Sequence, residues 1–87
     1  MKTKMKAKLS DQIRTLVEVQ ADFSNRLIPK GILGTVVECY ENPEGYAVDL
    51  AIPNESFVGS FEYENVFLCP DQFIVIDIRS KTLNVSI

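Results

Sequence analysis

Alternation of hydrophobic and polar positions with a period of two runs through most of this sequence. From residue 12 to residue 19 the β-branched side chains fall on one face, which predicts a half-buried strand. A short helix capped by Ser10 and Asp11 is the alternative here, but the β-branched content favours the strand. Similar runs of β-branched and aromatic residues predict further strands at residues 35–40, 46–52, 57–62 and 66–69. The pattern therefore predicts an all-β protein.

Two glycines three positions apart, Gly31 and Gly34, precede the second predicted strand. Because glycine adopts positive φ at little steric cost, we interpret both as residues of a structural turn in which the backbone bends sharply. A third glycine, Gly59, lies inside the predicted strand at residues 57–62. A glycine in that position is typical of a bulge or of a close approach by another backbone.

The alternation also assigns side chains to the two faces of the predicted sheet. Glu38 and Asp49 are expected on the solvent face, so their neighbours in the same strands should point inward. The side chains expected to face the core in the second and third strands are Val37, Cys39, Val48 and Leu50.

The segment from residue 21 to residue 30 has no clear period, and its Ser, Asn and Pro residues predict a long loop over one end of a barrel. Its apolar residues, Phe23, Leu27 and Ile28, either plug the mouth of the barrel or belong to a binding loop. Residues 63–65 predict a single 3₁₀ turn before the last of the five strands. Five short strands, one long loop and such a turn follow the order of an SH3-like five-stranded barrel.

Residues 72–79 and 82–87 again alternate and predict an additional C-terminal β-hairpin. An isolated hairpin is marginally stable in water, so this one must pack on the barrel or on a second subunit. We expect a homodimer through the hairpin, in which Phe73 and Val75 pack across a two-fold axis. In the alternative arrangement, the hairpin folds back over residues 12–19 and both of its faces are covered within one chain.

The 87 residues are expected to make one domain, with a flexible basic arm (1–10), a barrel (11–70) and the hairpin extension (71–87). The net charge of −3 is unevenly distributed. Four lysines in the first eight residues give +4, and the remaining five basic and twelve acidic residues give −7. An acidic barrel repels phosphate backbones, so we expect it not to bind nucleic acid. The arm is either a disordered, solubilising tail or a contact for nucleic acid or an acidic membrane surface.

No run of the sequence approaches the roughly 18–20 apolar residues of a membrane span. The lysines near the N-terminus are not followed by the apolar stretch of a secretory signal. We therefore expect a cytoplasmic protein with no membrane partner, in which Cys39 and Cys69 are reduced thiols.

The sequence predicts no catalytic or metal site. It contains no histidine, the commonest general base and metal ligand. Two cysteines without an evident neighbouring cation or further soft ligands predict neither a reactive thiol nor a zinc site. Glu38 and Asp49 lie on neighbouring predicted strands, but solvated carboxylates outside a pocket do not form an acid–base pair. We expect a non-enzymatic protein with no cofactor and no metal.

A glycine-centred motif runs Lys30-Gly31-x-x-Gly34-Thr35-Val36-Val37-Glu38-x-Tyr40 and continues as Tyr46-x-Val48-Asp49. With Val17-Glu18-Val19 and Phe67-Leu68, it resembles the small bacterial family catalogued as domain of unknown function 4926, over roughly residues 12–69. The resemblance implies an SH3-like barrel, whose glycine turn is similar to that of KOW-type barrels in ribosomal and transcription proteins. Because members resemble accessory proteins encoded near other small, sometimes toxin-like, bacterial genes, it also implies an accessory or antitoxin-like role. The loop at residues 21–28 and the hairpin at 72–87 depart from the family pattern.

These observations favour a protein-interaction module with a protein partner. Tryptophan, which is prominent in proline-reading grooves, is absent, so strand addition or a flat interface fits better than a proline-rich ligand. A small nucleic-acid-associated, KOW-like protein that uses the basic arm is the alternative, and an enzyme is third. The candidate interaction surface comprises Phe23, Leu27, Tyr40, Tyr46, Tyr63, Phe73 and Val75.

Overall fold

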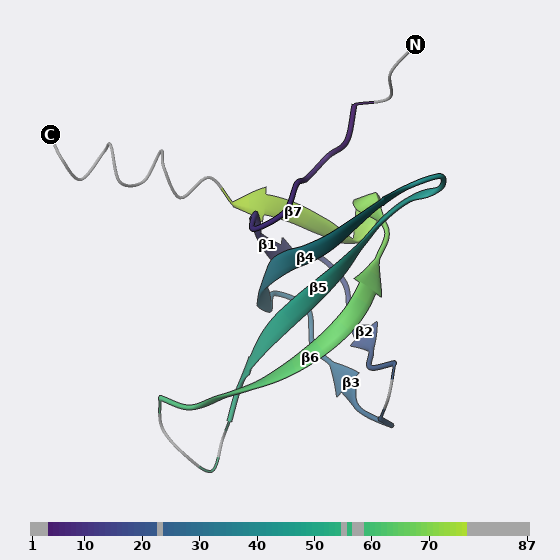
Figure 1. Ribbon diagram of the computed structural model, residues 1–87. Helices are drawn as coiled ribbons and strands as arrows, with labels where there is room; N and C mark the ends of the chain where they lie inside the picture. The colour runs from purple at the N-terminus through teal and green to yellow at the C-terminus, as the bar shows by residue number, and fades with distance from the viewer. Residues whose placement is uncertain (1–3, 23, 55, 57–58, 77–87) are drawn as a thin grey trace, which may run out of the picture.

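The structure is a computed structural model that describes residues 4–22, 24–54, 56 and 59–76 (Figure 1). The predicted all-β class is confirmed, because the described residues form seven strands and one 3₁₀ turn. In chain order these elements are β1 (Gln12–Thr15), β2 (Val19–Gln20), β3 (Leu27–Ile28), β4 (Leu33–Glu41), β5 (Glu44–Pro53), β6 (Phe61–Leu68), the 3₁₀ turn η1 (Pro70–Gln72) and β7 (Phe73–Ile76).

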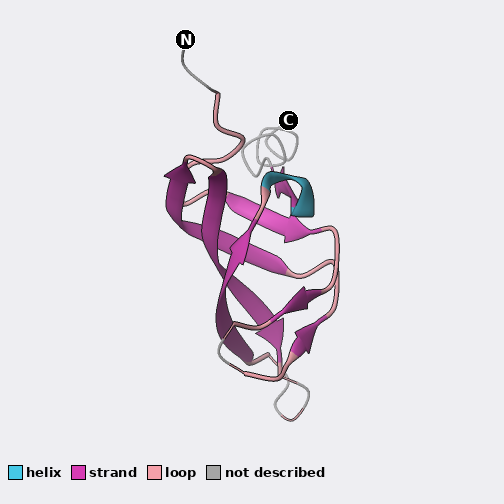
Figure 2. Cartoon of the chain, turned by 90° about the vertical axis from the view of Figure 1, so that its right-hand side faces the viewer, coloured by secondary structure: helices cyan, strands magenta, loops and turns pink. Residues whose placement is uncertain are grey.

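Five of the strands form one antiparallel sheet in the order β6-β5-β4-β1-β7. Strands β4, β5 and β6 make a meander of long, twisted strands that lie side by side in Figures 1 and 2. β1 lies between β4 and β7, so strands from the two ends of the described chain are neighbours. β2 and β3 form a separate two-stranded ribbon, which lies toward the other end of the molecule from β7.

β1 is a strand, as predicted, and not the alternative helix, but it ends at Thr15. There, Thr15 N–H donates to Ile32 O at 2.9 Å and Gly31 N–H donates to Thr15 O at 2.9 Å. The chain then leaves the sheet and enters the β2–β3 ribbon, in which Val19 lies opposite Ile28. The long unpatterned loop expected between the first two strands is therefore partly ordered as a ribbon.

The core lies on the inner face of the sheet. Every second side chain of β5 is buried, which confirms the inward positions expected for Val48 and Leu50. In β4 the expectation holds for Cys39, which is half-buried against the core, but it is wrong for Val37, which is exposed while its neighbour Val36 is buried. The β4–β5 pairing is irregular directly after Val36, and an extra residue there shifts the alternation of faces. The buried hydrophobic cluster comprises Ala7, Ile13, Val19, Ala21, Ile28, Val36, Tyr46, Val48, Leu50, Ile52, Val66, Leu68 and Phe73.

The two glycines predicted to form a turn have different roles. Gly31 adopts a φ of +86°, as expected. Gly34 does not have a positive φ and lies inside β4, so its assignment to a turn is wrong. A Cβ atom at Gly34 would lie 2.8 Å from both Leu50 Cδ2 and Val48 Cγ1, so glycine is required there by close packing. Gly59 has a φ of +84° and precedes β6 instead of lying within a strand.

The 3₁₀ turn lies later in the chain than predicted. Residues 63–65 are in the middle of β6, where they pair with residues 49–51 of β5. The prediction of a turn at these residues is wrong, because cross-strand pairing holds them extended and joins two predicted strands into one. The observed turn, η1, begins at Pro70, a residue that suits a first helical position because it needs no N–H partner.

β7 belongs to the same sheet as β1, with Thr15 opposite Phe73 and Gln12 opposite Ile76. Phe73 is 0% exposed, and its ring meets the ring of Tyr46 edge-on with the centroids 5.4 Å apart. Phe73 therefore packs in the core of its own chain, and the expectation that it packs across a two-fold axis is wrong. The second half of the predicted hairpin falls within residues 77–87, outside the described residues.

Residues 5–10 contact the sheet, whereas Lys4 is exposed beyond it. Ala7 is buried in the core cluster. Lys6 N–H donates to Tyr46 OH at 3.0 Å, and Ala7 N–H donates to the same oxygen at 3.2 Å. This packing differs from the flexible arm expected for residues 1–10. The Tyr46 hydroxyl binds the backbone of Lys6 and Ala7, and the lysine-rich sequence gives no sign of such a partner.

Candidate functional site

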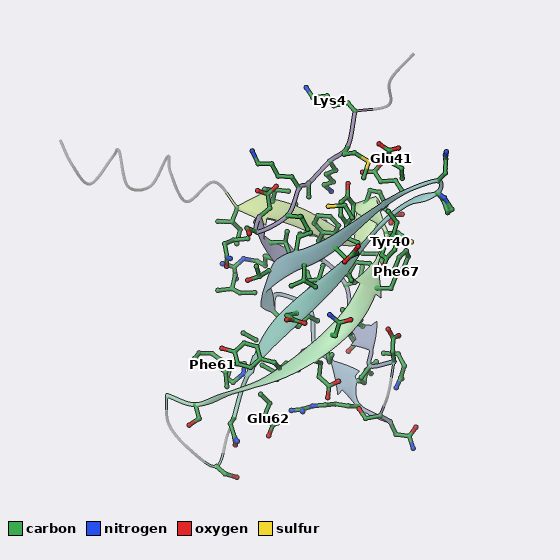
Figure 3. All side chains as sticks on the ribbon, in the orientation of Figure 1. Lys4, Tyr40, Glu41, Phe61, Glu62 and Phe67 are labelled. Atoms are coloured by element: carbon green, nitrogen blue, oxygen red, sulfur yellow. The ribbon has the colours of Figure 1, made fainter. Side chains whose placement is uncertain are left out.

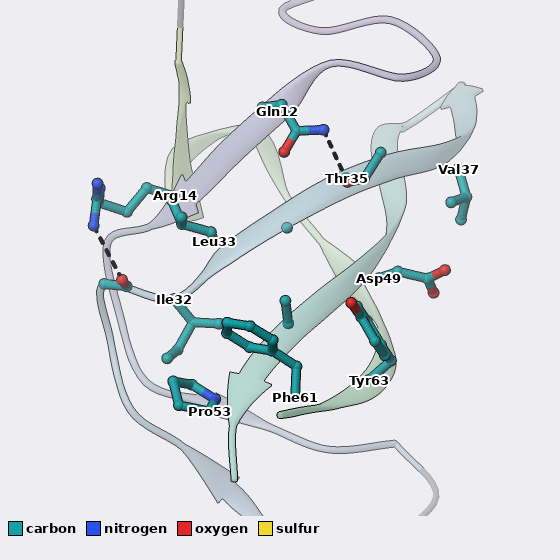
Figure 4. A pocket seen from close by; sticks show the side chains of 13 residues that line it. Gln12, Arg14, Ile32, Leu33, Thr35, Val37, Asp49, Pro53, Phe61 and Tyr63 are labelled. Atoms are coloured by element: carbon teal, nitrogen blue, oxygen red, sulfur yellow. Dashed lines mark hydrogen bonds between the residues drawn. The ribbon is translucent and has the colours of Figure 1, made fainter. Parts of the chain in front are cut away.

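The outer face of the sheet carries an open hollow with a volume of about 580 Å³, which we call the outer-face groove (Figure 4). Strands β1, β4, β5 and β6 all contribute to its walls and floor. The residues that line it are Gln12, Arg14, Gly31, Ile32, Leu33, Gly34, Thr35, Val37, Asp49, Ala51, Pro53, Phe61 and Tyr63.

Strand pairing explains why these residues come together. Leu33 of β4 lies opposite Ala51 of β5, and Ala51 lies opposite Tyr63 of β6, so the three side chains form one row across the sheet. The next pair along β5 and β6 on the same face is Pro53 and Phe61. Because alanine is small and its neighbours are large, the row is low at its centre and high at its sides, which makes the groove.

The groove exposes large apolar side chains to solvent. Leu33 is 45% exposed, Phe61 is 51% exposed and Tyr63 is 68% exposed. Figure 4 shows the Phe61 ring beside Ile32 and Pro53, so that the apolar surface continues along the groove. Single exposed hydrophobic residues are common in proteins, whereas these side chains lie together on one face of the sheet.

The polar groups at the rim of the groove are largely paired with one another. Gln12 Nε2 donates to Thr35 Oγ1 at 2.9 Å, and Arg14 Nη1 donates to the Gly31 carbonyl at 3.3 Å (Figure 4). The single carboxylate of the lining, Asp49, accepts a hydrogen bond from Asn65 Nδ2 at 2.8 Å.

The two carboxylates considered for acid–base chemistry are not opposite each other. Glu38 lies opposite Ala47, whereas Asp49 lies opposite Thr35 in a different row of the sheet. The groove therefore presents one carboxylate, already hydrogen-bonded, among apolar side chains. Such a lining, with a single carboxylate among mainly apolar side chains, is suited to contact with an apolar surface.

A second aromatic group lies further along the same sheet. The rings of Tyr40 and Phe67 are tilted by 46° with their centroids 5.8 Å apart, and Figure 3 shows them together, far from Phe61. Phe67 covers Gly45, where a Cβ atom would lie 2.0 Å from the Phe67 ring. Tyr40 is 47% exposed, so this pair adds apolar surface outside the groove.

The structure separates the residues predicted to form one interaction surface. Tyr63 lies in the outer-face groove, whereas Leu27, Tyr40 and Val75 are exposed on β3, β4 and β7 respectively. Tyr46 and Phe73 are fully buried, so their assignment to a surface is wrong: each lies on the inner face, where the two rings pack together. Phe23 lies outside the described residues.

Three exposed residues of the groove, Leu33, Val37 and Phe61, were not predicted as site residues. Alternation could have located Leu33, because the strand neighbour of a buried Gly34 must face outward. It could not have located Val37, whose exposure depends on the irregular pairing after Val36.

A partly buried hydrogen-bond cluster joins the N-terminal segment to the sheet. Besides accepting from the two backbone N–H groups, Tyr46 OH donates to Glu44 Oε2, which also accepts from Lys6 N–H at 2.9 Å. The Lys6 ammonium group donates to the carbonyls of Pro70 and Phe73 and lies 4.7 Å from the centre of the Phe73 ring. One lysine therefore contacts β5, η1 and β7 through its backbone and side chain.

The electrostatics of this cluster favour a structural role. Burial raises the pKa of the Tyr46 hydroxyl, and the hydrogen bond to Glu44 raises it further. The hydrogen bond from Tyr46, followed by that from Lys6 N–H, lowers the pKa of Glu44. At neutral pH the phenol is thus protonated and donates to an ionised carboxylate, which stabilises the packing and leaves the phenol unsuited to act as a base.

The two cysteines are free thiols, with Cys39 half-buried and Cys69 exposed. Burial raises the pKa of Cys39, and the charges of Glu38 and Asp11 raise it further, which disfavours the nucleophilic thiolate. Within the described residues, no group of three or more histidine, cysteine or acidic side chains is placed to hold a metal ion.

Comparisons of the chain with protein-family models, with curated proteins and with solved structures find no match. In the part of the chain that the structure describes, no helix has the length and apolar character needed to cross a membrane.

Proposed function

We propose that this protein is a non-enzymatic protein-interaction module with an SH3-like barrel fold, and that it binds a protein partner in the outer-face groove. The fold assignment is supported by the sheet order β6-β5-β4-β1-β7, by the long excursion between β1 and β4, and by the 3₁₀ turn directly before the last strand. An accessory or antitoxin-like role agrees with the resemblance to the family catalogued as domain of unknown function 4926.

The observation that carries the binding proposal is the row of exposed apolar side chains centred on Leu33, Ala51 and Tyr63. The groove is an open hollow, so it suits an extended or flat protein surface better than an enclosed small molecule. Fully burying one large apolar side chain contributes roughly 1.5–3 kcal/mol. Leu33, Phe61 and Tyr63 are 45–68% exposed, so each has about half of this contribution left to give, and a complex would need further contacts around them to offset the entropy lost on association.

Protein is favoured over nucleic acid as the partner because of the charges near the groove. Its lining contains one cation, Arg14, and one carboxylate, Asp49, instead of the basic surface that follows a phosphate backbone. The Lys6 ammonium group, which belongs to the basic N-terminal segment, is held by two backbone carbonyls.

The proposal is tested by affinity capture from the native cell with groove variants as comparison. Leu33→Asp and Tyr63→Asp place a charge on the groove, whereas Leu16→Asp places the same charge at a residue that is 46% exposed but does not line it. We expect one protein to be recovered with the wild type and with Leu16→Asp, in amounts that nuclease treatment does not change, and to decrease at least about tenfold with both groove variants.

Circular dichroism of all three variants checks that each is folded. Equal recovery of the partner by the groove variants would refute the assignment of the groove. Recovery of nucleic acid, sensitive to nuclease and to replacement of Lys2, Lys4 and Lys8 by serine, would instead support the KOW-like alternative.

A further inference from the structure

Cross-strand pairing divides the outer face of the sheet into rows that differ in chemistry. The apolar row described above ends on β6 at Tyr63. The row after the next ends on β6 at Phe67, which lies opposite Ala47. The row between these two is polar and comprises Gln12, Thr35, Asp49 and Asn65. A polar row therefore crosses the outer face between two exposed aromatic rings of the same strand.

Asp49 provides the carboxylate of the polar row and is half-buried. Its Oδ1 accepts a hydrogen bond from Asn65 Nδ2 at 2.8 Å, and within the described residues it has no second donor and no ion pair. The cation of the groove lining, Arg14, donates instead to the Gly31 carbonyl and lies across the groove from Asp49 (Figure 4). The part of the chain that the structure describes thus leaves Oδ2 of Asp49 for a donor from another molecule.

A partner that covers the groove removes water from this carboxylate. Burying a charge without a counterpart is strongly unfavourable, whereas charge-assisted hydrogen bonds from a cation compensate for the lost hydration. A partner therefore needs a cationic group at Asp49. A phosphate backbone would instead meet the carboxylate with a charge of the same sign.

The aromatic rings beside Asp49 favour the same kind of group. Tyr63 and Phe67 lie two positions before and after Asn65 along β6, so both are diagonal neighbours of Asp49, at about 7–8 Å between Cα atoms, a separation that aromatic side chains reach across. Tyr63 is 68% exposed and Phe67 is 47% exposed, and Figure 4 shows the Asp49 carboxylate beside the Tyr63 ring. Arginine suits this position, because its planar guanidinium donates to a carboxylate and stacks on aromatic rings.

The spacing of the rows matches an extended segment. Alternate residues on one face of a strand are about 6.6 Å apart, and this spacing separates the positions of Tyr63, Asn65 and Phe67 along β6. Alternate side chains of an extended segment that lies along β5 and β6 have the same spacing. Successive turns of a helix advance by only about 5.4 Å, so a helix falls out of step with the rows by roughly 2 Å over two steps.

We propose that Asp49 determines the specificity of the outer-face groove by binding an arginine in an extended segment of the partner. Apolar residues two positions before and after this arginine pack on Tyr63 and Phe67. This specificity rests on the proposed function of the groove as a protein-binding site, and it defines the chemistry by which the partner is recognised. A neutral or acidic residue in place of the arginine leaves the carboxylate unpaired and is rejected.

Selection from a phage-displayed library of random nonapeptides tests the proposal, with the full chain as bait. Asp49→Asn removes the charge but keeps an oxygen that can accept from Asn65. The matched control is Glu38→Gln, which removes an exposed charge in the row of Ala47, outside the groove lining. Leu33→Asp disables the groove itself, and circular dichroism checks that each variant is folded.

We expect the wild type and Glu38→Gln to enrich peptides in which an arginine has apolar residues two positions before and after it. Asp49→Asn should lose the preference for arginine and retain the two apolar positions. A synthetic peptide of the enriched sequence should bind Asp49→Asn at least about tenfold more weakly than the wild type in titration calorimetry.

Other results would refute the role of Asp49 without refuting the groove. These are peptides that Leu33→Asp fails to enrich but that carry no arginine, or that carry it equally with Asp49→Asn as bait. An equal loss of arginine with Glu38→Gln would show an effect of overall charge, and apolar residues three or four positions from the arginine would overturn the extended conformation. If the wild type and Leu33→Asp enrich the same peptides or none, the proposed function itself is refuted.

Discussion

Replacing Gly34 with alanine should destabilise the protein, although alanine is intrinsically preferred to glycine within a strand by roughly 0.5–1 kcal/mol. The added Cβ would lie 2.8 Å from side-chain atoms of Leu50 and Val48 and 2.9 Å from the Asp49 carbonyl oxygen, whereas ordinary contacts begin at 3.4 Å. Leu50 and Val48 are fully buried, and the carbonyl belongs to the paired strand β5. Overpacking of this kind costs about 1–3 kcal/mol, so we expect a net loss on the order of 1–2 kcal/mol in the free energy of unfolding.

Urea denaturation followed by circular dichroism and tyrosine fluorescence measures this loss, since the protein has three tyrosines and no tryptophan. Gly45→Ala is the matched control. Its Cβ would lie still closer to a neighbour, 2.0 Å from Phe67 Cζ, but that atom is the tip of a ring that is 47% exposed. The ring can turn aside, so Gly45→Ala should cost less than Gly34→Ala.

A double-mutant cycle identifies the cause. Leu50→Val removes the Cδ2 atom that the new Cβ would meet, so Gly34→Ala should cost less in that background, with a coupling of at least about 0.5 kcal/mol. If Gly34→Ala is as stable as the wild type, or if its cost is the same with Leu50→Val, close packing is not the reason for glycine at this position.

Three further predictions concern the cluster around Tyr46. Tyr46→Phe removes the hydroxyl that accepts from Lys6 and Ala7, which should lower the free energy of unfolding by about 1–3 kcal/mol in urea denaturation. Because the folded protein lowers the pKa of Glu44 below its ordinary value of 4.5, this carboxylate stabilises the fold above pH 4.5, and the contribution disappears as the pH falls through the lowered pKa. Glu44→Gln should therefore be less stable than the wild type at pH 7 and approach it as the pH falls below 4.5 through the lowered pKa, and a difference independent of pH would contradict this assignment. Lys6→Met removes the ammonium group that holds the Pro70 and Phe73 carbonyls, and amide exchange in η1 and β7 should accelerate while that of β5 changes less.

The class of the fold and the inward face of β5 could be predicted because both follow from local alternation. Val48 and Leu50 occupy the positions that a period of two assigns to them. The misassignments arose where pairing with a neighbouring strand, and not the local sequence, decides the backbone conformation or the face on which a side chain lies. Residues 63–65 look like a turn in isolation but are held extended by β5, and the face of Val37 depends on an irregular pairing that its own sequence does not contain.

The candidate site was less predictable than the fold, because side chains of four different strands build it. Tyr63 could be named from its aromatic character, but its neighbours Leu33 and Phe61 become a surface only when the register brings them together. Phe73 shows the opposite case. An apolar strand near the C-terminus suggests an interface, whereas pairing with β1 places its ring in the core.

The position of β1 between β4 and β7 also sets an order of events while the chain is being made. Adjacent strands joined by short connections can pair early, so the β4–β5–β6 meander forms before β7 reaches β1 across most of the sequence. Until Ile76 has left the ribosome, β1 therefore has an unpaired side that can bind a strand of another nascent chain. We expect the yield of folded protein to depend on how closely nascent chains are crowded, more than on the stability of the finished molecule.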